Sequence, residues 1–387
     1  MIFVFLWGCF FVASWQFVED VCDTGVRSVP VCDIQEEVKC MKALYCKNSL
    51  PILQTIFFIL LGVACLFVVR ARAEKQQVVV YTSVDQVYAE PVLRKFERES
   101  GIEVLPIYDV EAAKTTGLVM RLIAEKGRPR ADVFWSGEFS HTLLLQEKGV
   151  LQPYASPLAR DIPAQFRDPQ GFWTGFAGRA RVLIVNTDLV SEDNFPDSVD
   201  DLLSPNYPGE MLGMAYPIFG TSATHAAALY ALHGPQQARQ WFEDVRGRGV
   251  RMVDGNSVIR DLVVQGRLQW GITDTDDACV AMKKGASVKV VFPDQDDTGT
   301  LVITNTVALI KGAPHPEQGR KLIDYLVSPE TEAELVRLGW SHIPLREIAQ
   351  PSECYGHLDV KPMHVDYRKV FENLESAKED LARMFIR

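Results

Sequence analysis

The sequence predicts an α/β protein of two lobes, each built on a mostly parallel sheet, with two long strands joining them. A chain of 387 residues is longer than a single core usually supports. From about residue 76, short β-branched runs alternate with amphipathic segments of helical length, a pattern typical of parallel sheets covered by helices on both faces. Two longer β-like runs, 179–187 and 300–310, separate the two blocks that show this alternation. We expect these runs to be the strands that cross between the lobes.

The first block contains three strand–helix pairs. In chain order we expect a strand at 78–81, a helix with apolar Val92, Leu93 and Phe96, a strand at 102–108, a helix at 112–126, a strand at 132–135 and a helix at 139–147. Gly101 and Gly149 follow the first and last of these helices, and glycine is favoured just after a helix end. The block therefore supplies the sheet of the first lobe.

The second block repeats the rhythm. We expect strands at 211–216, 250–253, 270–273 and 288–292, with helices at 221–233 and 256–265. The chain would leave lobe one near residue 182 and return near residue 304. Lobe one would then comprise 76–182 and 305–387, including a C-terminal helical tail at 366–385 that packs on it, and lobe two would comprise 183–304.

The first 73 residues differ from the rest of the chain. They hold six of the eight cysteines and equal numbers of acidic and basic residues, so the net charge of −10 belongs to the remainder. The apolar run 50–69 is followed by Ala71-Arg72-Ala73, a pattern of small residues that favours a secretory signal peptide beginning at Met41. An uncleaved membrane anchor at 50–69 is the alternative. Either Met1 or Met41 is the start, and with Met41 the first 40 residues are an upstream extension.

Acidic side chains follow several of the predicted strands. In open α/β sheets the carboxyl ends of the strands face the crevice that binds ligands. The acids at these positions are Asp85, Glu111, Glu138, Asp274, Asp276 and Asp277. Clustered carboxylates repel unless a cation lies among them. Hard metal ions prefer oxygen ligands, and an organic ammonium group would serve equally. The overall negative charge argues against a nucleic-acid partner.

A second set of side chains suits an anionic group. Thr221, Ser222 and Asn256 lie at predicted helix starts, where free backbone N–H groups favour negative charge. Arg179 and Arg181 begin the first crossing strand with their side chains on one face. The plainer interpretation is that the hydroxyl and amide residues cap helices and that Arg181 pairs with a neighbouring acid.

Five stretches carry a resemblance to a known family. In order, these are VVVYTSVDQ, KFERESGIEV, ADVFWSGEF with EKGVLQPY, GRARVLIVNTD, and HPEQGRKLIDYLVSPETEAELV. From about Val78 to Leu345 the chain resembles bacterial extracellular solute-binding proteins of family 1, the group that includes ferric-iron, polyamine, thiamine and aminoethylphosphonate binders. The ferric-iron-binding group is the most similar. The resemblance implies the two-lobed type II periplasmic-binding-protein fold, two hinge strands, and ABC permease and ATPase subunits as partners.

The resemblance also implies site residues, with one departure. Asp85 stands where the ferric binders commonly have a histidine, Glu138 lies near their glutamate, and Arg179 retains a basic residue that often contacts an accompanying anion. The two adjacent tyrosines that usually bind iron are absent from Thr273-Asp274-Thr275-Asp276-Asp277. A metal ligand would therefore be held by Asp85, Glu138, Asp274 and Asp276.

The implied function is extracytoplasmic capture of a cationic ligand, ferric iron or another metal, by closure of the lobes about the hinge. A polyamine or an aminoalkylphosphonate-type zwitterion is the alternative ligand. The resemblance further implies an exported monomeric binding protein with no enzymatic activity and no tightly bound cofactor, which meets the membrane only through its N-terminal segment. A membrane-tethered sensor and a metal-dependent hydrolase using residues 274–277 are other possible classes, but H-E-x-x-H, G-x-S-x-G and P-loop motifs are lacking.

Overall fold

The structure, a computed structural model, describes residues 76–108, 116–348 and 351–386. Residues from Lys75 onward form one compact unit. The predictions for the first 73 residues and for Glu111 lie outside the described part. Within it, no helix is both long and apolar enough to cross a membrane.

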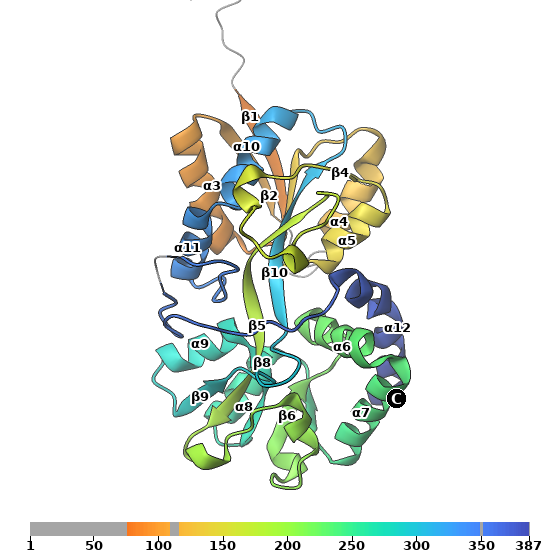
Figure 1. Cartoon of the computed structure of the whole chain (residues 1–387), viewed down its shortest axis with the longest axis vertical. Coiled ribbons are helices and arrows are strands. Elements are labelled where there is room, and N and C mark those ends of the chain that lie inside the picture. The colour runs from red at the N-terminus through yellow and green to blue at the C-terminus, as the bar shows by residue number, and fades with distance from the viewer. Residues whose placement is uncertain (1–75, 109–115, 349–350, 387) are drawn as a thin grey trace, which may run out of the picture. The chain divides into compact units, whose positions relative to one another are not determined.

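Lobe one is built on a sheet whose first three strands are parallel. Its strands are β1 (Gln77–Thr82), β2 (Glu103–Tyr108), β3 (Val133–Ser136) and β4 (Leu151–Gln152), with β1 between β2 and β3. Its helices are α3 (Gln86–Ser100), α4 (Thr116–Ala124), α5 (Ser140–Glu147), α10 (Pro316–Leu326) and α11 (Pro329–Leu338). Gly101 ends α3 in the left-handed conformation, at φ 69°. The helices lie on both sides of the sheet (Figure 1).

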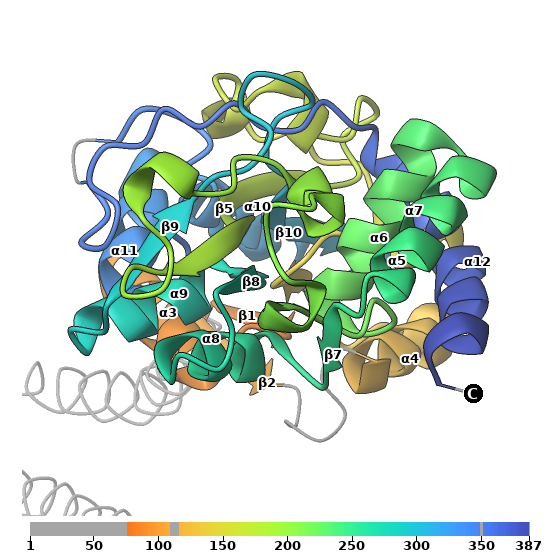
Figure 2. The same cartoon turned by 90° about the horizontal axis from the view of Figure 1, so that it is seen from below.

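Lobe two repeats this plan. Its strands are β6 (Leu212–Ala215), β7 (Arg251–Val253), β8 (Trp270–Asp274) and β9 (Val288–Val291), with β6 parallel to both β7 and β8. Its helices are α6 (Gly220–His233), α7 (Pro235–Gly247), α8 (Asn256–Val264) and α9 (Thr275–Lys283). Short 3₁₀ turns occupy the connections of the two lobes, at Glu125–Gly127, Pro157–Ala159, Ala164–Phe166, Glu192–Asn194, Val199–Leu203 and Gly209–Met211. Seen from below in Figure 2, helices again lie on both sides of the strands.

Two long antiparallel strands, β5 (Thr174–Asn186) and β10 (Val302–Ile310), join the lobes. β5 pairs with β10 as far as Ala180 and with β8 from Arg181 onward, so it belongs to both sheets. The ladder thereby runs continuously in the order β2-β1-β3-β10-β5-β8-β6-β7. This confirms the two-lobed α/β class, while the lobe boundaries drawn at residues 182 and 305 remain a prediction.

The C-terminal segment differs from expectation. The tail was expected to pack on lobe one, but its helix α12 (Tyr367–Phe385) packs along α6, and Ala377, Leu381 and Met384 join the lobe-two core. Its N-terminal part also contacts lobe one: Tyr367 stacks on Phe139 with ring centroids 3.8 Å apart, and Phe371 and Leu374 pack against the core that contains both rings. The expectation was wrong because an amphipathic pattern shows that a helix is half-buried without showing against what.

A disulfide holds the segment that precedes α12. Cys354 is bonded to Cys279 of α9, and the Tyr355 hydroxyl donates to the Thr275 carbonyl at 2.6 Å. The C-terminal segment therefore contacts lobe two at α9 as well as at α6.

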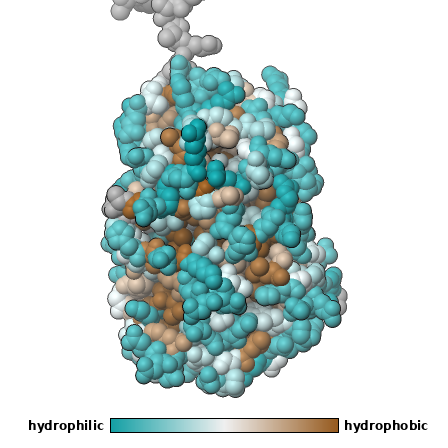
Figure 3. Space-filling model, viewed as in Figure 1, coloured by the Kyte–Doolittle hydropathy of each residue, from teal (hydrophilic) through white to brown (hydrophobic). Residues whose placement is uncertain are grey.

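Figure 3 shows apolar side chains gathered at the middle of the face drawn there, between the two lobes, with hydrophilic surface around them.

Candidate functional site

A buried ion pair organises the lobe-two side of the site. Arg181 of β5 lies directly opposite Asp274 of β8 in the antiparallel register, and its Nη1 donates to Asp274 Oδ1 at 2.7 Å. The two side chains are 1% and 5% exposed. Burial acts to raise the pKa of Asp274, but the charges of Arg181 and Arg179 and the hydrogen bonds from Thr221 and Arg181 lower it below its ordinary value. Asp274 is therefore ionised, and the charge of Arg181 balances it.

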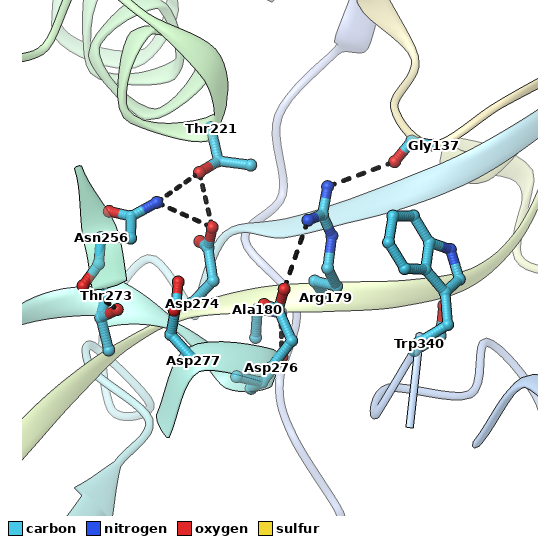
Figure 4. Close-up of polar contacts among 12 residues, drawn as sticks. Gly137, Arg179, Ala180, Thr221, Asn256, Thr273, Asp274, Asp276, Asp277 and Trp340 are labelled. Atoms are coloured by element: carbon cyan, nitrogen blue, oxygen red, sulfur yellow. Dashed lines mark hydrogen bonds and ion pairs between the residues drawn. The ribbon is translucent and has the colours of Figure 1, made fainter. Parts of the chain in front are cut away.

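Thr221, Ser222 and Asn256 close a network around this pair. The Thr221 hydroxyl and the Asn256 amide donate to Asp274 Oδ2 at 2.6 and 2.9 Å (Figure 4). The Asn256 Oδ1 and the Ser222 hydroxyl accept from Arg181 at 3.0 and 3.4 Å. The interpretation that Arg181 pairs with a neighbouring acid is confirmed. The residues predicted to bind an anion thus lie together, and their side chains form hydrogen bonds with Arg181 and Asp274.

Asp276 and Arg179 face the cavity between the lobes. Arg179 Nη1 lies 3.6 Å from Asp276 Oδ2, and its Nη2 donates to the Gly137 carbonyl of lobe one at 3.4 Å. Its guanidinium also lies over the Trp340 ring, 5.1 Å from the centroid (Figure 4). Burial raises the pKa of Asp276, and the nearby Asp274 adds to this although Arg179 opposes it. The buried Asp276 Oδ1 accepts no hydrogen bond from the described residues.

Asp277 is the third carboxylate of this cluster. One ligand atom from each of Asp274, Asp276 and Asp277 lies within 4.8 Å of the others. Arg260 of α8 donates to Asp277 Oδ1 at 3.1 Å. Burial, together with the charges of Asp276 and Asp274, raises the pKa of Asp277 to about 7. Asp277 does not line the cavity, so the cluster contributes Asp274 and Asp276 to it.

Lobe one contributes Glu138 and Asp85. Glu138 lies between β3 and α5, where its Oε1 accepts from the Ser140 hydroxyl and from the backbone N–H and ring of His141. Burial acts to raise the pKa of Glu138, but His141 and Ser140 lower it to about 2. Asp85 immediately precedes α3 and is half-buried. Both side chains line the same cavity as Asp276 and Arg179.

The cavity has a volume of about 680 Å³ and lies where the strand ends of both lobes meet. Of the predicted ligand residues within the described chain, all except Asp277 line it; these are Asp85, Glu138, Arg179, Thr221, Ser222, Asn256, Asp274 and Asp276. Sequence reasoning missed the partners of the acids, Arg260 and His141. Both lie one helical turn from a predicted site residue, at i+4 from Asn256 and i+3 from Glu138, and this spacing was a usable signal.

Comparison with known proteins agrees with this architecture. Residues 129–354, more than half of the chain, match the family model described as bacterial extracellular solute-binding protein. The chain is 26% identical to iron uptake protein A1 of Synechocystis sp., over 70% of this chain and 76% of that protein. It is 24% identical to the major ferric iron-binding protein of Neisseria meningitidis serogroup B, over 67% and 78%.

A solved structure supports the fold. The Trichodesmium protein IdiA (FutA), in complex with iron and citrate ligands, superposes with a TM-score of 0.71 at 23% identity, covering 80% of this chain and all of that one. The shared two-lobed fold, and a cavity lined by polar side chains from both lobes, accompany a family match over most of the described body. The chain belongs to the bacterial extracellular solute-binding protein family.

Proposed function

We propose that this protein is the substrate-binding component of an ABC importer and captures a cationic ligand in the cavity between its lobes. The observation that carries the proposal is the arrangement of carboxylates. Glu138 and Asp85 of lobe one and Asp276 of lobe two line one cavity, and the buried Oδ1 of Asp276 lacks a hydrogen-bond donor among the described residues. Carboxylates gathered in this way favour a positively charged ligand. The relatives named for iron uptake and ferric-iron binding support the same sign of charge.

We assign the cation to Asp85, Glu138 and Asp276, with ferric iron or another metal as the cargo. Asp274, which the sequence also suggested as a metal ligand, is saturated by Arg181, Thr221 and Asn256 and serves as the scaffold of the site. Oxygen ligands suit a hard metal ion. Arg179 lines the cavity beside these acids and would hold an anion that accompanies the metal.

A second candidate cargo is an organic amine, either a polyamine or an aminoalkylphosphonate-type zwitterion. The observation in its favour is the placement of Arg179 Nη1 3.6 Å from Asp276. A zwitterion could place its amine against Asp276 and its phosphonate or carboxylate against Arg179. A polyamine would use the acids alone.

Closure of the lobes about β5 and β10 would complete the site, because the proposed ligands come from both lobes. To move an open population of 99% to a closed one of 99%, a ligand must favour the closed form by about 5.5 kcal/mol. We propose that the permease recognises the closed form and that the protein acts as a monomer in the periplasm, either released from its N-terminal segment or anchored by it. The Cys279–Cys354 disulfide supports an oxidising compartment.

Native mass spectrometry and calorimetry of the purified protein, with and without a chelator, test this function. We expect bound mass that a chelator removes for a metal and leaves in place for an organic cation. Asp276→Asn should weaken binding of that ligand at least tenfold, while its matched control Asp277→Asn, whose side chain lies outside the cavity, should bind within about twofold of the unmodified protein. Equal affinities in the two variants would exclude Asp276 as a ligand residue.

A further inference from the structure

The cavity is lined by two chemically different sets of side chains. The carboxylates and Arg179 form one set. Apolar side chains from α5, from the loop between β6 and α6, and from α12 form the other; these are Leu144, Ile218, Phe219, Phe371 and Leu374. Two charged groups of α12, Glu375 and Lys378, also line the cavity. The proposed cation accounts for the first set and gives no role to the second.

The exposed ring of Phe219 indicates that an apolar group of the ligand binds in the cavity. Its side chain is 69% exposed, and it is the only exposed aromatic residue among those the structure describes. It stands immediately before α6, and Gly220, with φ of +51°, follows it at the helix start. An aromatic ring exposed in a cavity gains free energy when an apolar group covers it.

Helix α12 also lines the cavity and is firmly held. Phe371 and Leu374 are one turn apart and both half-buried, so they lie on the same face of the helix. The preceding turn is fixed by Tyr367, which stacks on Phe139 and donates to the Val302 carbonyl at 2.5 Å. Leu381, two turns later, is buried in the lobe-two core. The apolar wall is therefore formed before any ligand arrives.

The volume of the cavity also indicates a ligand larger than a bare metal ion. A water molecule occupies about 30 Å³ of liquid, whereas sites for organic molecules commonly measure about 300–1,000 Å³. At about 680 Å³ the cavity is far larger than a bare ion and its nearest waters require. Its lining includes the apolar side chains just described.

From these observations, and resting on the proposed function, we infer that the cargo carries an apolar organic group that packs between Phe219 and the Phe371–Leu374 face of α12. The cargo class is a cationic head joined to an apolar body. Two sources share this chemistry: a metal chelated by an aromatic ligand, and an organic amine with an aromatic or apolar substituent. In either case α12 and Phe219 select the body of the cargo, and the acids select its head.

Paired probes test the inference and separate the two sources. Calorimetry would compare ferric citrate with the ferric complex of 2,3-dihydroxybenzoate, and ethylamine with 2-phenylethylamine. The aromatic member of one pair should bind at least tenfold more tightly than its partner, and that pair identifies the source. Equal affinities within both pairs would overturn the inference.

Variants then locate the contact. Phe219→Ala and Phe371→Ala should remove most of the tenfold preference and leave the affinity for the smaller probe within about twofold. The matched control is Val87→Ala on α3, since Val87 is 68% exposed and lies outside the cavity. If Phe219 is instead covered by lobe one on closure, Phe219→Ala will weaken both probes equally, and the inference fails. Asp276→Asn reports separately on the proposed function, because it should weaken the smaller and larger probes alike.

Discussion

The two walls of the cavity present their carboxylates in different ways. On lobe two, Asp274 is 5% exposed and receives an arginine, a hydroxyl and an amide from three other elements, so the wall is fixed by buried cross-links. On lobe one, the Glu138 carboxylate accepts hydrogen bonds, within the described chain, from Ser140 and His141 of the adjoining helix, and its side chain is 17% exposed. This contrast suggests that lobe two is a preformed platform and that lobe one supplies carboxylates which adjust as the ligand arrives.

The largest effect should follow from removing Arg181. The variant Arg181→Ala leaves the buried Asp274 without its counter-charge, which should lower the free energy of unfolding by about 3–5 kcal/mol. Arg179→Ala, two residues earlier on β5, is the matched control and should cost less, about 1–2 kcal/mol, because its partner Asp276 is 30% exposed and stays partly hydrated without it. Urea denaturation followed by circular dichroism measures both. Equal losses would remove the distinction between a fixed wall and an adjustable one.

The disulfide should give the next largest effect, because it fastens α9, the helix that carries Asp276, to the C-terminal segment. Replacing both Cys279 and Cys354 with alanine opens a closed loop of 75 residues and should cost about 2–4 kcal/mol. Dithiothreitol should destabilise the unmodified protein by a similar amount and leave the double variant unchanged. A double variant as stable as the unmodified protein would show that packing alone holds α9.

The buried His225 of α6 lies near the Arg181–Asp274 pair, so its titration tests the lobe-two wall. Burial and the nearby charge of Arg181 lower its pKa from 6.5 to about 3, so the folded protein keeps it neutral while the unfolded chain takes up a proton below pH 6.5. The resulting stability is fully present above pH 6.5 and is lost as the pH falls toward 3. Between pH 6.5 and 5 the loss attributable to this group should approach about 2 kcal/mol. Chemical denaturation across this range should give a shallower slope for His225→Gln, and identical slopes would contradict the assignment.

Much of this arrangement was predictable from the sequence, because strand ends converge in an open α/β sheet. That rule predicts Asp85, Glu138, Asp276 and Asn256 around one cavity, and all four line it. Pairing of Arg181 with an acid was expected, but its partner Asp274 was not predictable, since it depends on the register that sets the two residues opposite each other across β5 and β8. The position of α12 and the pairing of Cys279 with Cys354 were also not predictable, because helical periodicity does not identify the surface that a helix packs against and cysteine spacing does not identify the bonded cysteine. Two of the apolar side chains that line the cavity, Phe371 and Leu374, come from α12.

The smallest effect should come from the lobe-one wall. His141→Ala removes the ring that helps to hold Glu138 ionised, so the pKa of Glu138 should rise from about 2 toward its ordinary value. Near pH 7 part of the stabilisation behind this low pKa is lost, but the Ser140 hydroxyl and the backbone N–H of residue 141 still bond the carboxylate, so the free energy of unfolding should fall by only about 1 kcal/mol. The affinity for the ligand found by native mass spectrometry should differ little at pH 7 and fall more steeply in the variant as the pH is lowered to 4.5. Calorimetry at the two pH values measures this difference. A stability loss as large as that of Arg181→Ala would mean that lobe one is as rigidly built as lobe two.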